Sequence, residues 1–223
     1  MTIKNRILEA LRQNLVPGLI LQCFALVLVL GYYYIPGITV LCLYIGEVKT
    51  EYGYLFSAIS TSFFGGVIPF LILCMRKEIE RAMVWKVGVF YTLFWLWKGV
   101  EIDFLYRMQA MLFGEGIDFY TILKKVIVDQ LVYNPFYAVI CIAVFHLWKD
   151  HHFSLSQTRR ALNRHLFTQV IPTMMFCTWL IWFPTTAIVY SMPSPLQMPL
   201  FNMVLCFYVL LINVVGSKKR RSS

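Results

Sequence analysis

Charged residues are scarce in this sequence: they make up 14% of its 223 residues, against 59% that are hydrophobic. A soluble globular domain is typically about a quarter charged, so this chain has too few charges to cover a water-facing surface. A surface that faces lipid needs no such cover. The mean hydropathy of +0.67 therefore favours an integral membrane protein whose main partner is the lipid bilayer.

The motifs of common catalytic and metal sites are also missing. The sequence contains no HExxH, no GxSxG, no glycine-rich phosphate loop and no CxxC pair. Its six cysteines all lie inside apolar runs, which is typical of small buried hydrophobic residues. We therefore expect no catalytic residues, no metal site and no cofactor, and predict that the protein is not an enzyme.

Long apolar runs predict an all-α fold, a polytopic transmembrane helical bundle with about six spans of roughly 20 residues each. The predicted spans cover residues 15–34, 54–75, 87–112, 122–148, 166–190 and 199–215. The third is interrupted by charges after residue 97, but residues 87–97 alone would be too short to cross. We therefore predict one continuous helix over residues 87–112.

The chain divides into three regions. Residues 1–53 comprise an amphipathic lead at the membrane surface, an extra first transmembrane helix, and a re-entrant or interfacial loop. Residues 54–216 form the main helical bundle, in which Gly65 and Gly66 are expected on a packing face because small residues let helices approach closely. Residues 217–223 form a basic cytoplasmic tail.

Six spans place most of the 20 Lys and Arg residues on one side of the membrane. These residues are Lys4, Arg6, Arg12, Arg76, Lys77, Arg81, Lys86, Lys149, Arg159, Arg160, Arg164, Lys218, Lys219, Arg220 and Arg221. The loops on the other side carry Glu47, Glu51, Glu115 and Asp118. By the positive-inside rule, both termini are then cytoplasmic. The net charge of +9 therefore indicates how the chain is oriented in the membrane, and we expect no nucleic-acid partner.

Ionisable residues inside the predicted spans are the candidates for function, because each costs about 2.5–3.5 kcal/mol even on a lenient insertion scale. In the third span, Lys98 and Glu101 are i, i+3 neighbours, and Asp103 and Arg107 are i, i+4 neighbours. The two pairs fall on roughly opposite helix faces. They are either structural ion pairs or the wall of a polar pathway, and the spacing fits both.

The fourth span carries a second polar group, made of Lys125, Asp129, Gln130, Tyr133 and Asn134. Asp129 and Tyr133 share one helical stripe. Asp129 can pair with Lys125 one turn before it, or across helices with Lys98 or Arg107. Because Pro135 has no amide proton, we predict a helix kink there. Polar contacts that only hold the helices together would explain this group equally well.

Residues 122–137, ILKKVIVDQLVYNPFY, match the pattern K-x-x-x-D-Q-x-x-x-x-P through Lys125, Asp129, Gln130 and Pro135. Here the chain resembles the peroxisomal membrane protein 22-kilodalton family, which has mitochondrial inner-membrane relatives. Upstream, residues 105–114 are similar to the family's W-Y-x-x-L helix end, and downstream, residues 178–213 resemble its final segment. The family's G-D-x-x-x-Q and G-P-x-x-H-x-W-Y motifs are replaced, and residues 1–50 have no counterpart, as in a distant, bacterial branch.

The resemblance implies a poorly selective membrane pore, or a membrane protein that affects metabolite balance and reactive oxygen. It favours a bacterial inner membrane, or a mitochondrial inner or peroxisomal membrane if the protein is eukaryotic. We thus expect a small-solute channel or transporter whose polar path is lined by the third and fourth spans. The alternative is a non-transporting scaffold or assembly factor whose intramembrane ion pairs lock the fold. A small-molecule solute and a second copy of the chain are the expected partners.

Overall fold

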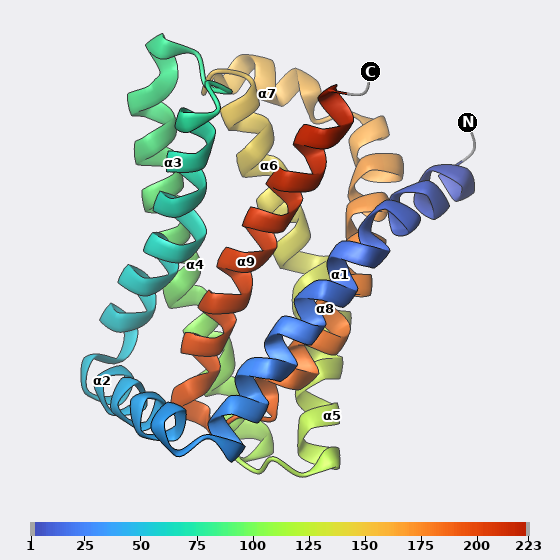
Figure 1. Ribbon diagram of the computed structural model, residues 1–223. Helices are drawn as coiled ribbons and strands as arrows, with labels where there is room; N and C mark the ends of the chain where they lie inside the picture. Colours follow the sequence, from blue (N-terminus) through green and yellow to red (C-terminus); the bar gives the residue numbers. More distant parts are fainter. Residues whose placement is uncertain (1–2, 222–223) are drawn as a thin grey trace.

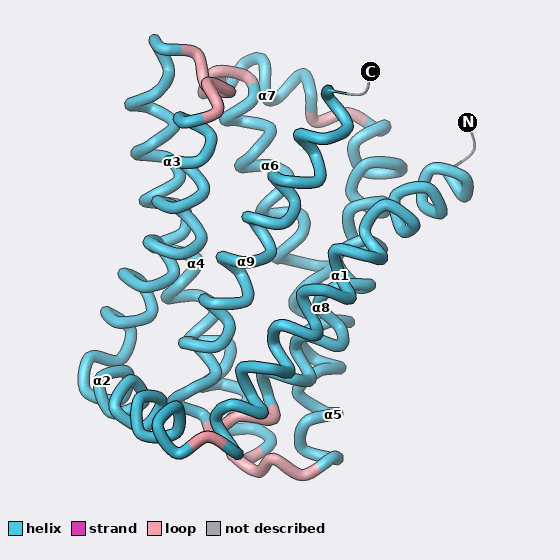
Figure 2. The backbone as a smooth tube through the Cα atoms, viewed as in Figure 1, coloured by secondary structure: helices cyan, strands magenta, loops and turns pink. Residues whose placement is uncertain are grey.

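The computed structural model describes the backbone of residues 3–221 and the side chains of residues 4–209. Within this part of the chain, every regular element is a helix (Figures 1 and 2). The helices are α1 (Ile3–Tyr34), α2 (Pro36–Thr61), α3 (Ile68–Met75), α4 (Val84–Phe113), α5 (Phe119–Val128), α6 (Val139–Asp150), α7 (Leu155–Ala161), α8 (Ile171–Tyr190) and α9 (Ser194–Arg221). Three π-helical segments, η1 (Ser62–Val67), η3 (Asp129–Ala138) and η4 (Leu166–Val170), and a 3-10 turn, η2 (Arg81–Met83), join some of them. The predicted all-α fold class is confirmed.

The helices run up and down one bundle (Figure 1). In that view α1 descends, α2 crosses the lower end and then rises through η1 into α3, and α4 descends again. The rod α5–η3–α6 rises, η4–α8 descends and α9 rises, while the short α7 lies at the upper end. As a result, α1 begins and α9 ends at the same end of the bundle. The side chains of the basic tail, residues 217–223, lie outside the described part.

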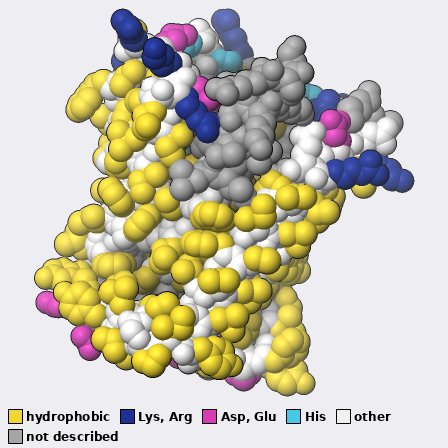
Figure 3. All heavy atoms as spheres, viewed as in Figure 1, with side chains coloured by type: hydrophobic (Ala, Val, Ile, Leu, Met, Phe, Trp, Pro, Cys, Tyr) yellow, Lys and Arg dark blue, Asp and Glu magenta, His cyan; other side chains and the backbone are white. Residues whose placement is uncertain are grey.

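Four helical segments are long and apolar enough to cross a membrane: Lys4–Tyr34, Pro36–Met75, Phe119–Asp150 and Leu166–Tyr190. Large hydrophobic side chains point outward from them, and Figure 3 shows such side chains covering the middle of the drawn face. Lys and Arg side chains gather near the upper end of that face, and Asp and Glu side chains lie along its lower edge. This distribution is compatible with an integral membrane protein.

The third predicted span is one uninterrupted helix, α4, of 30 residues. The sequence predicts this continuity because residues 87–97 alone are too short to cross a membrane. The amino-terminal lead differs from the prediction. It is continuous with the first apolar run, so that both form the single 32-residue helix α1. Pro17 lies inside α1, and one proline bends a helix more readily than it ends it.

Helix α2 changes direction at Gly53, whose backbone angles are φ +52° and ψ −122°. A residue with a β-carbon rarely adopts a positive φ, so glycine is well suited to this position. Residues 36–52 are helical and lie across the lower end of the bundle, where the sequence predicted a re-entrant or interfacial loop (Figure 1). Residues 54–61 then turn upward beside α4.

The rising part of α2 and η1 packs closely on α4 through glycines. A β-carbon on Gly99 would lie 2.3 Å from the carbonyl oxygen of Ser57, and one on Gly66 would lie 2.7 Å from that of Tyr91. A β-carbon on Gly65 would meet Leu205 of α9 at 2.7 Å. The predicted packing role of Gly65 and Gly66 is therefore confirmed, and it fixes η1 against both α4 and α9.

Candidate functional site

The first polar cluster surrounds Asp103 in the lower half of α4. The ammonium of Lys49 lies 2.9 Å from Asp103 Oδ2, and Ser57 Oγ donates a hydrogen bond of 2.9 Å to the same oxygen. Arg107 Nε donates to Asp103 Oδ1 at 3.3 Å, and the Arg107 guanidinium lies over the Tyr54 ring, 4.7 Å from its centroid. The predicted i, i+4 pair is thus confirmed, but it is one part of a larger cluster.

Lys49 is the main member of this cluster that the sequence did not reveal. It stands between Glu47 and Glu51, which the sequence predicts to be loop residues, yet only 5% of its surface is exposed. The turn at Gly53 folds residues 36–52 under the bundle, and this brings Lys49 to Asp103. A lysine near a glycine is too common a pattern to predict such a contact.

The second cluster lies about one and a half turns earlier on α4 and faces η3 instead of α2. Lys98 forms an ion pair with Glu101, as predicted, and its ammonium also donates to Tyr133 Oη at 3.0 Å. Tyr133 in turn donates to Glu101 Oε1, and Tyr137 donates to Glu101 Oε2 at 3.3 Å. Lys98 is 2% exposed, so both charges of the pair are satisfied inside the protein.

The third cluster is built around Asp129 at the start of η3. Tyr190 of α8 donates to Asp129 Oδ2 at 2.8 Å, and the Gln130 amide donates to Oδ1 at 2.9 Å. Gln109 of α4 donates to Tyr190 Oη at 2.9 Å, and Gln130 also donates to Thr186 Oγ1 at 2.9 Å. Asp129 therefore accepts hydrogen bonds from neutral donors that join three helices.

The π-helical segment η3 contributes to two clusters. Asp129 accepts a hydrogen bond from Tyr190 of α8, while Tyr133 and Tyr137 donate to Glu101 of α4. The stripe predicted for Asp129 and Tyr133 therefore reaches both α8 and α4. Pro135 lies inside this segment, and its missing amide is compatible with the altered hydrogen-bond register. The distortion predicted at Pro135 thus takes the form of a π-helix.

Lys125 does not pair with Asp129 in the way that the spacing suggested. Its ammonium lies over the ring of Tyr190, 5.9 Å from the ring centroid. Among the described side chains, Asp129 forms no ion pair with a lysine, arginine or histidine. The remaining predicted member, Asn134, donates to Gln130 Oε1 at 3.1 Å and so belongs to the Asp129 cluster.

A cavity of about 250 Å³ lies in the bundle between the second and third clusters. Its polar lining consists of Lys98, Asp129, Gln130, Asn134, Thr178 and Thr186, with the Tyr133 hydroxyl beside them. Aromatic rings form much of the remaining wall, from Trp95, Tyr106, Tyr133, Trp182, Phe201 and Tyr208. We call it the central cavity.

A second cavity of about 570 Å³ lies at the lower end, lined by Lys49, Asp103, Arg107 and Glu115 among others. We call it the lower cavity. Tyr106 lines both cavities, and its ring packs edge-on against Tyr190 at 5.2 Å between centroids. Of the charges predicted for one polar path, Lys98 and Asp129 line the central cavity and Asp103 and Arg107 line the lower cavity. Glu101 and Lys125 line neither of the two.

In comparisons with family models, with curated proteins and with solved structures, no match to this chain was found. The geometry of the three clusters and two cavities therefore carries the functional argument. The family resemblance of residues 122–137 stays a prediction from the sequence.

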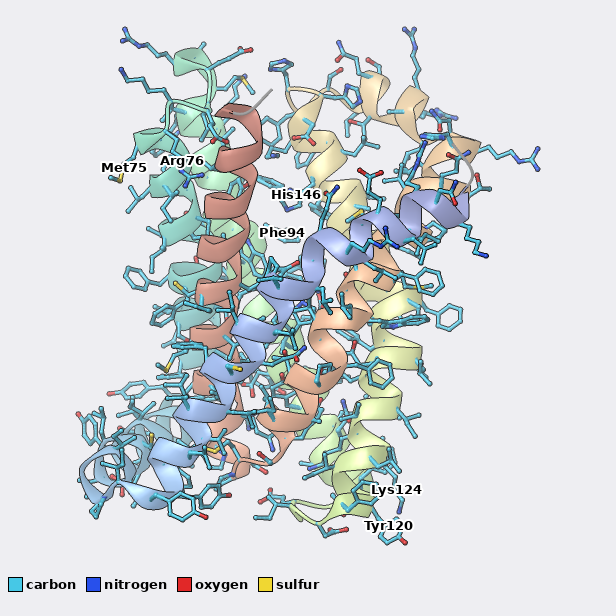
Figure 4. All side chains as sticks on the ribbon, turned by 45° about the vertical axis from the view of Figure 1, so that its right-hand side comes forward. Met75, Arg76, Phe94, Tyr120, Lys124 and His146 are labelled. Atoms are coloured by element: carbon cyan, nitrogen blue, oxygen red, sulfur yellow. The ribbon has the colours of Figure 1, made fainter. Side chains whose placement is uncertain are left out.

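Residues suited to metal binding do not gather in the described part of the chain: no group of three or more His, Cys, Asp or Glu side chains could hold a metal ion there. His146 instead packs among aromatic rings, 6.0 Å from the ring centroid of Phe94 (Figure 4). The six cysteines are free thiols.

The loop between α4 and α5 contains a carboxylate with a local structural role. Asp118 caps the amino terminus of α5 by accepting hydrogen bonds of 3.1 Å from the backbone amides of Tyr120 and Thr121. Hydrogen bonds, the largest effect coming from the Thr121 side chain, lower the pKa of Asp118. Nearby on α5, Tyr120 and Lys124 point away from the bundle at its lower end (Figure 4).

Proposed function

We propose that this protein is a small-solute channel or transporter that crosses the membrane six times with both termini on the cytoplasmic side. Its path runs through the central and lower cavities, along α4 and the α5–η3–α6 rod. The observation that carries the proposal is the central cavity, which is lined by two charged and several polar side chains inside the helical bundle. Polar groups at such a depth mark solute pathways in membrane proteins.

The six-span arrangement adds α4 and α9 to the four most apolar segments. A helix of 30 residues, such as α4, is about 45 Å long, which exceeds the hydrocarbon thickness of about 30 Å. The charges of α4 lower its hydropathy, but Lys98 and Asp103 are 2% and 3% exposed and thus turned away from lipid. The basic residues at the end where α1 begins support a cytoplasmic placement of that end.

The size and order of the cavities suit a small solute. The central cavity lies just below the range of about 300–1,000 Å³ that is typical of pockets for larger ligands. Because Tyr106 lines both cavities, the proposed path passes its ring. A solute that enters from the lower end would meet Asp103 and Arg107 first, and Asp129 after Tyr106.

Solute flux into liposomes that contain the purified protein tests the proposal. We expect uptake of small solutes by the wild type, reduced uptake for Asp129→Asn and Glu101→Gln, and increased uptake for Tyr106→Ala because the smaller side chain widens the passage. Glu9→Gln, which changes an exposed carboxylate on α1 far from the cavities, is the matched control. Absence of flux in the wild type, or equal flux in all four variants, would contradict the proposal.

The pairing around Asp103 favours a second candidate, a membrane scaffold or assembly factor without transport. Three donors satisfy this carboxylate, and they tie α2 to α4. Under this alternative, removing single charges would lower stability in detergent while liposomes with the wild type would take up no solute. The flux measurement therefore decides between the two candidates.

A further inference from the structure

The charges that line the central cavity are unequally compensated. Lys98 and Asp129 are the charged members of its lining. The Lys98 ammonium is already bonded to Glu101 and Tyr133 and lies over the rings of Tyr133 and Tyr137. Its positive charge is thus neutralised by a carboxylate of its own helix turn.

No described side chain gives Asp129 such a counter-charge. Its two hydrogen bonds come from Tyr190 and Gln130, which are both neutral donors. Lys98 interacts with it electrostatically, but the Lys98 ammonium is bonded to Glu101. A carboxylate has about four acceptor positions, so about two of them stay available at Asp129. A carboxylate that is 7% exposed needs a proton or a cation to offset its charge.

The rest of the cavity lining indicates which cation fits. Aromatic faces attract cations, and quaternary ammonium groups are recognised by cages of several such rings. Trp95, Tyr106, Trp182 and Phe201 supply rings to the lining. Hard metal cations such as Ca²⁺ instead require six to eight oxygen ligands, which a lining made mainly of aliphatic and aromatic side chains does not provide.

We propose that the central cavity binds a small organic ammonium ion, with Asp129 as its counter-charge and the surrounding aromatic rings as its cage. This inference rests on the proposed function, because it names the class of solute for the same cavity. It also assigns distinct roles to the two charged lining residues. Asp129 binds the solute, while Lys98, which is neutralised by its ion pair with Glu101, does not.

Binding of tetramethylammonium chloride to the purified full chain in detergent tests the proposal by titration calorimetry. The neutral tert-butanol and sodium chloride at equal ionic strength are the comparison ligands. We expect saturable binding of tetramethylammonium, and at least tenfold weaker binding of both comparison ligands. Equal affinity for tert-butanol would overturn the proposal, since the charge would then be irrelevant.

Variants separate the two parts of the site. Asp129→Asn should raise the dissociation constant for tetramethylammonium at least tenfold, whereas Glu9→Gln should leave it unchanged. If Asp129→Asn does not fold, Trp182→Leu gives a second test, because it removes a ring from the cage but keeps the carboxylate and should weaken binding severalfold. Unchanged binding in Trp182→Leu, or in a folded Asp129→Asn, would count against the site.

The same preparations in liposomes distinguish failure of this inference from failure of the proposed function. Binding of tetramethylammonium that depends on Asp129, without flux of any solute, would refute transport and keep the ammonium site. Flux of neutral or anionic solutes, without binding or flux of tetramethylammonium, would keep transport and refute the ammonium site.

Discussion

Asp103 and Asp129 are both buried aspartates, with 3% and 7% of their surfaces exposed, but their surroundings differ in kind. Asp103 is held by the cations Lys49 and Arg107 and by one hydroxyl group, whereas Asp129 is held by a phenol and an amide. The comparison teaches that burial alone does not assign a role. The partners decide whether a carboxylate locks helices together or keeps a negative charge beside a cavity.

The cost in stability of altering each aspartate depends on which groups would be left without a partner. Removing one member of a buried ion pair leaves an uncompensated charge, and this is strongly destabilising. Removing a charge that has only neutral partners leaves hydrogen-bonding groups that an amide can still satisfy in part. We therefore expect Asp103 variants to affect mainly stability and Asp129 variants to affect mainly the cavity.

The largest effect is expected for Lys49→Met, which leaves Asp103 with Ser57 and the half-exposed Arg107. The free energy of unfolding in detergent should fall by about 3–5 kcal/mol, the usual cost of breaking a buried pair. The double variant Lys49→Met/Asp103→Leu should recover much of this loss, because it buries no unpaired charge. A single variant as stable as the wild type would remove the distinction between the two aspartates.

A smaller effect is expected for Gly99→Ala, which tests how far the Asp103 cluster depends on close helix packing. The added methyl group would lie 2.3 Å from the Ser57 carbonyl oxygen, and so must push α2 away from α4. Such overpacking typically costs about 1–3 kcal/mol, measured by unfolding in detergent. Gly37→Ala is the matched control, because a β-carbon there would meet nothing within 4 Å. Equal stability of the two variants would mean that the contact adjusts freely.

For Asp129→Asn we expect a loss of stability of only about 0.5–1.5 kcal/mol, the range of one net hydrogen bond. The asparagine oxygen can still accept from Tyr190, while the bond from Gln130 is lost. Asp103→Asn, measured in the same unfolding experiment, should cost clearly more because it leaves Lys49 without a counter-charge. Equal losses in the free energy of unfolding for the two asparagine variants would contradict the proposed difference between Asp103 and Asp129.

The smallest effect is expected at Asp118, a carboxylate that faces water. Because its pKa is lowered in the folded protein, its contribution to stability is present above the ordinary pKa of an aspartate and is lost as the pH falls through the lowered value. The acid sensitivity of helix content should therefore decrease slightly in Asp118→Asn, which keeps the cap without the charge. An NMR titration of Asp118 that gave an ordinary pKa would contradict this prediction.

Local spacing in the sequence predicted the pairs that lie on one helix. Lys98 with Glu101 and Asp103 with Arg107 are within one turn of each other, and the continuity of α4 followed from the shortness of residues 87–97. Contacts that depend on a change of chain direction or helix register were not predictable. Lys49 reaches Asp103 only through the turn at Gly53, and Tyr190 reaches Asp129 across 61 positions of the chain.

One expectation for the fourth span was wrong, the pairing of Lys125 with Asp129. The backbone amide of Asp129 still bonds to the Lys125 carbonyl oxygen, but the Lys125 ammonium lies over the Tyr190 ring. Spacing along one helix could not reveal this aromatic partner, because Tyr190 comes from α8. Pro135 predicted a distortion of the helix, but neither the type of the distortion nor its extent.

The glycine at position 53 has a mechanical consequence for access to the lower cavity. Without the reversal there, residues 36–52 would continue straight beyond the bundle for about 25 Å. Instead they lie under the bundle, where Lys49 and Thr50 line the lower cavity. The ion pair of Lys49 with Asp103 therefore holds this segment of the chain beside the lower cavity.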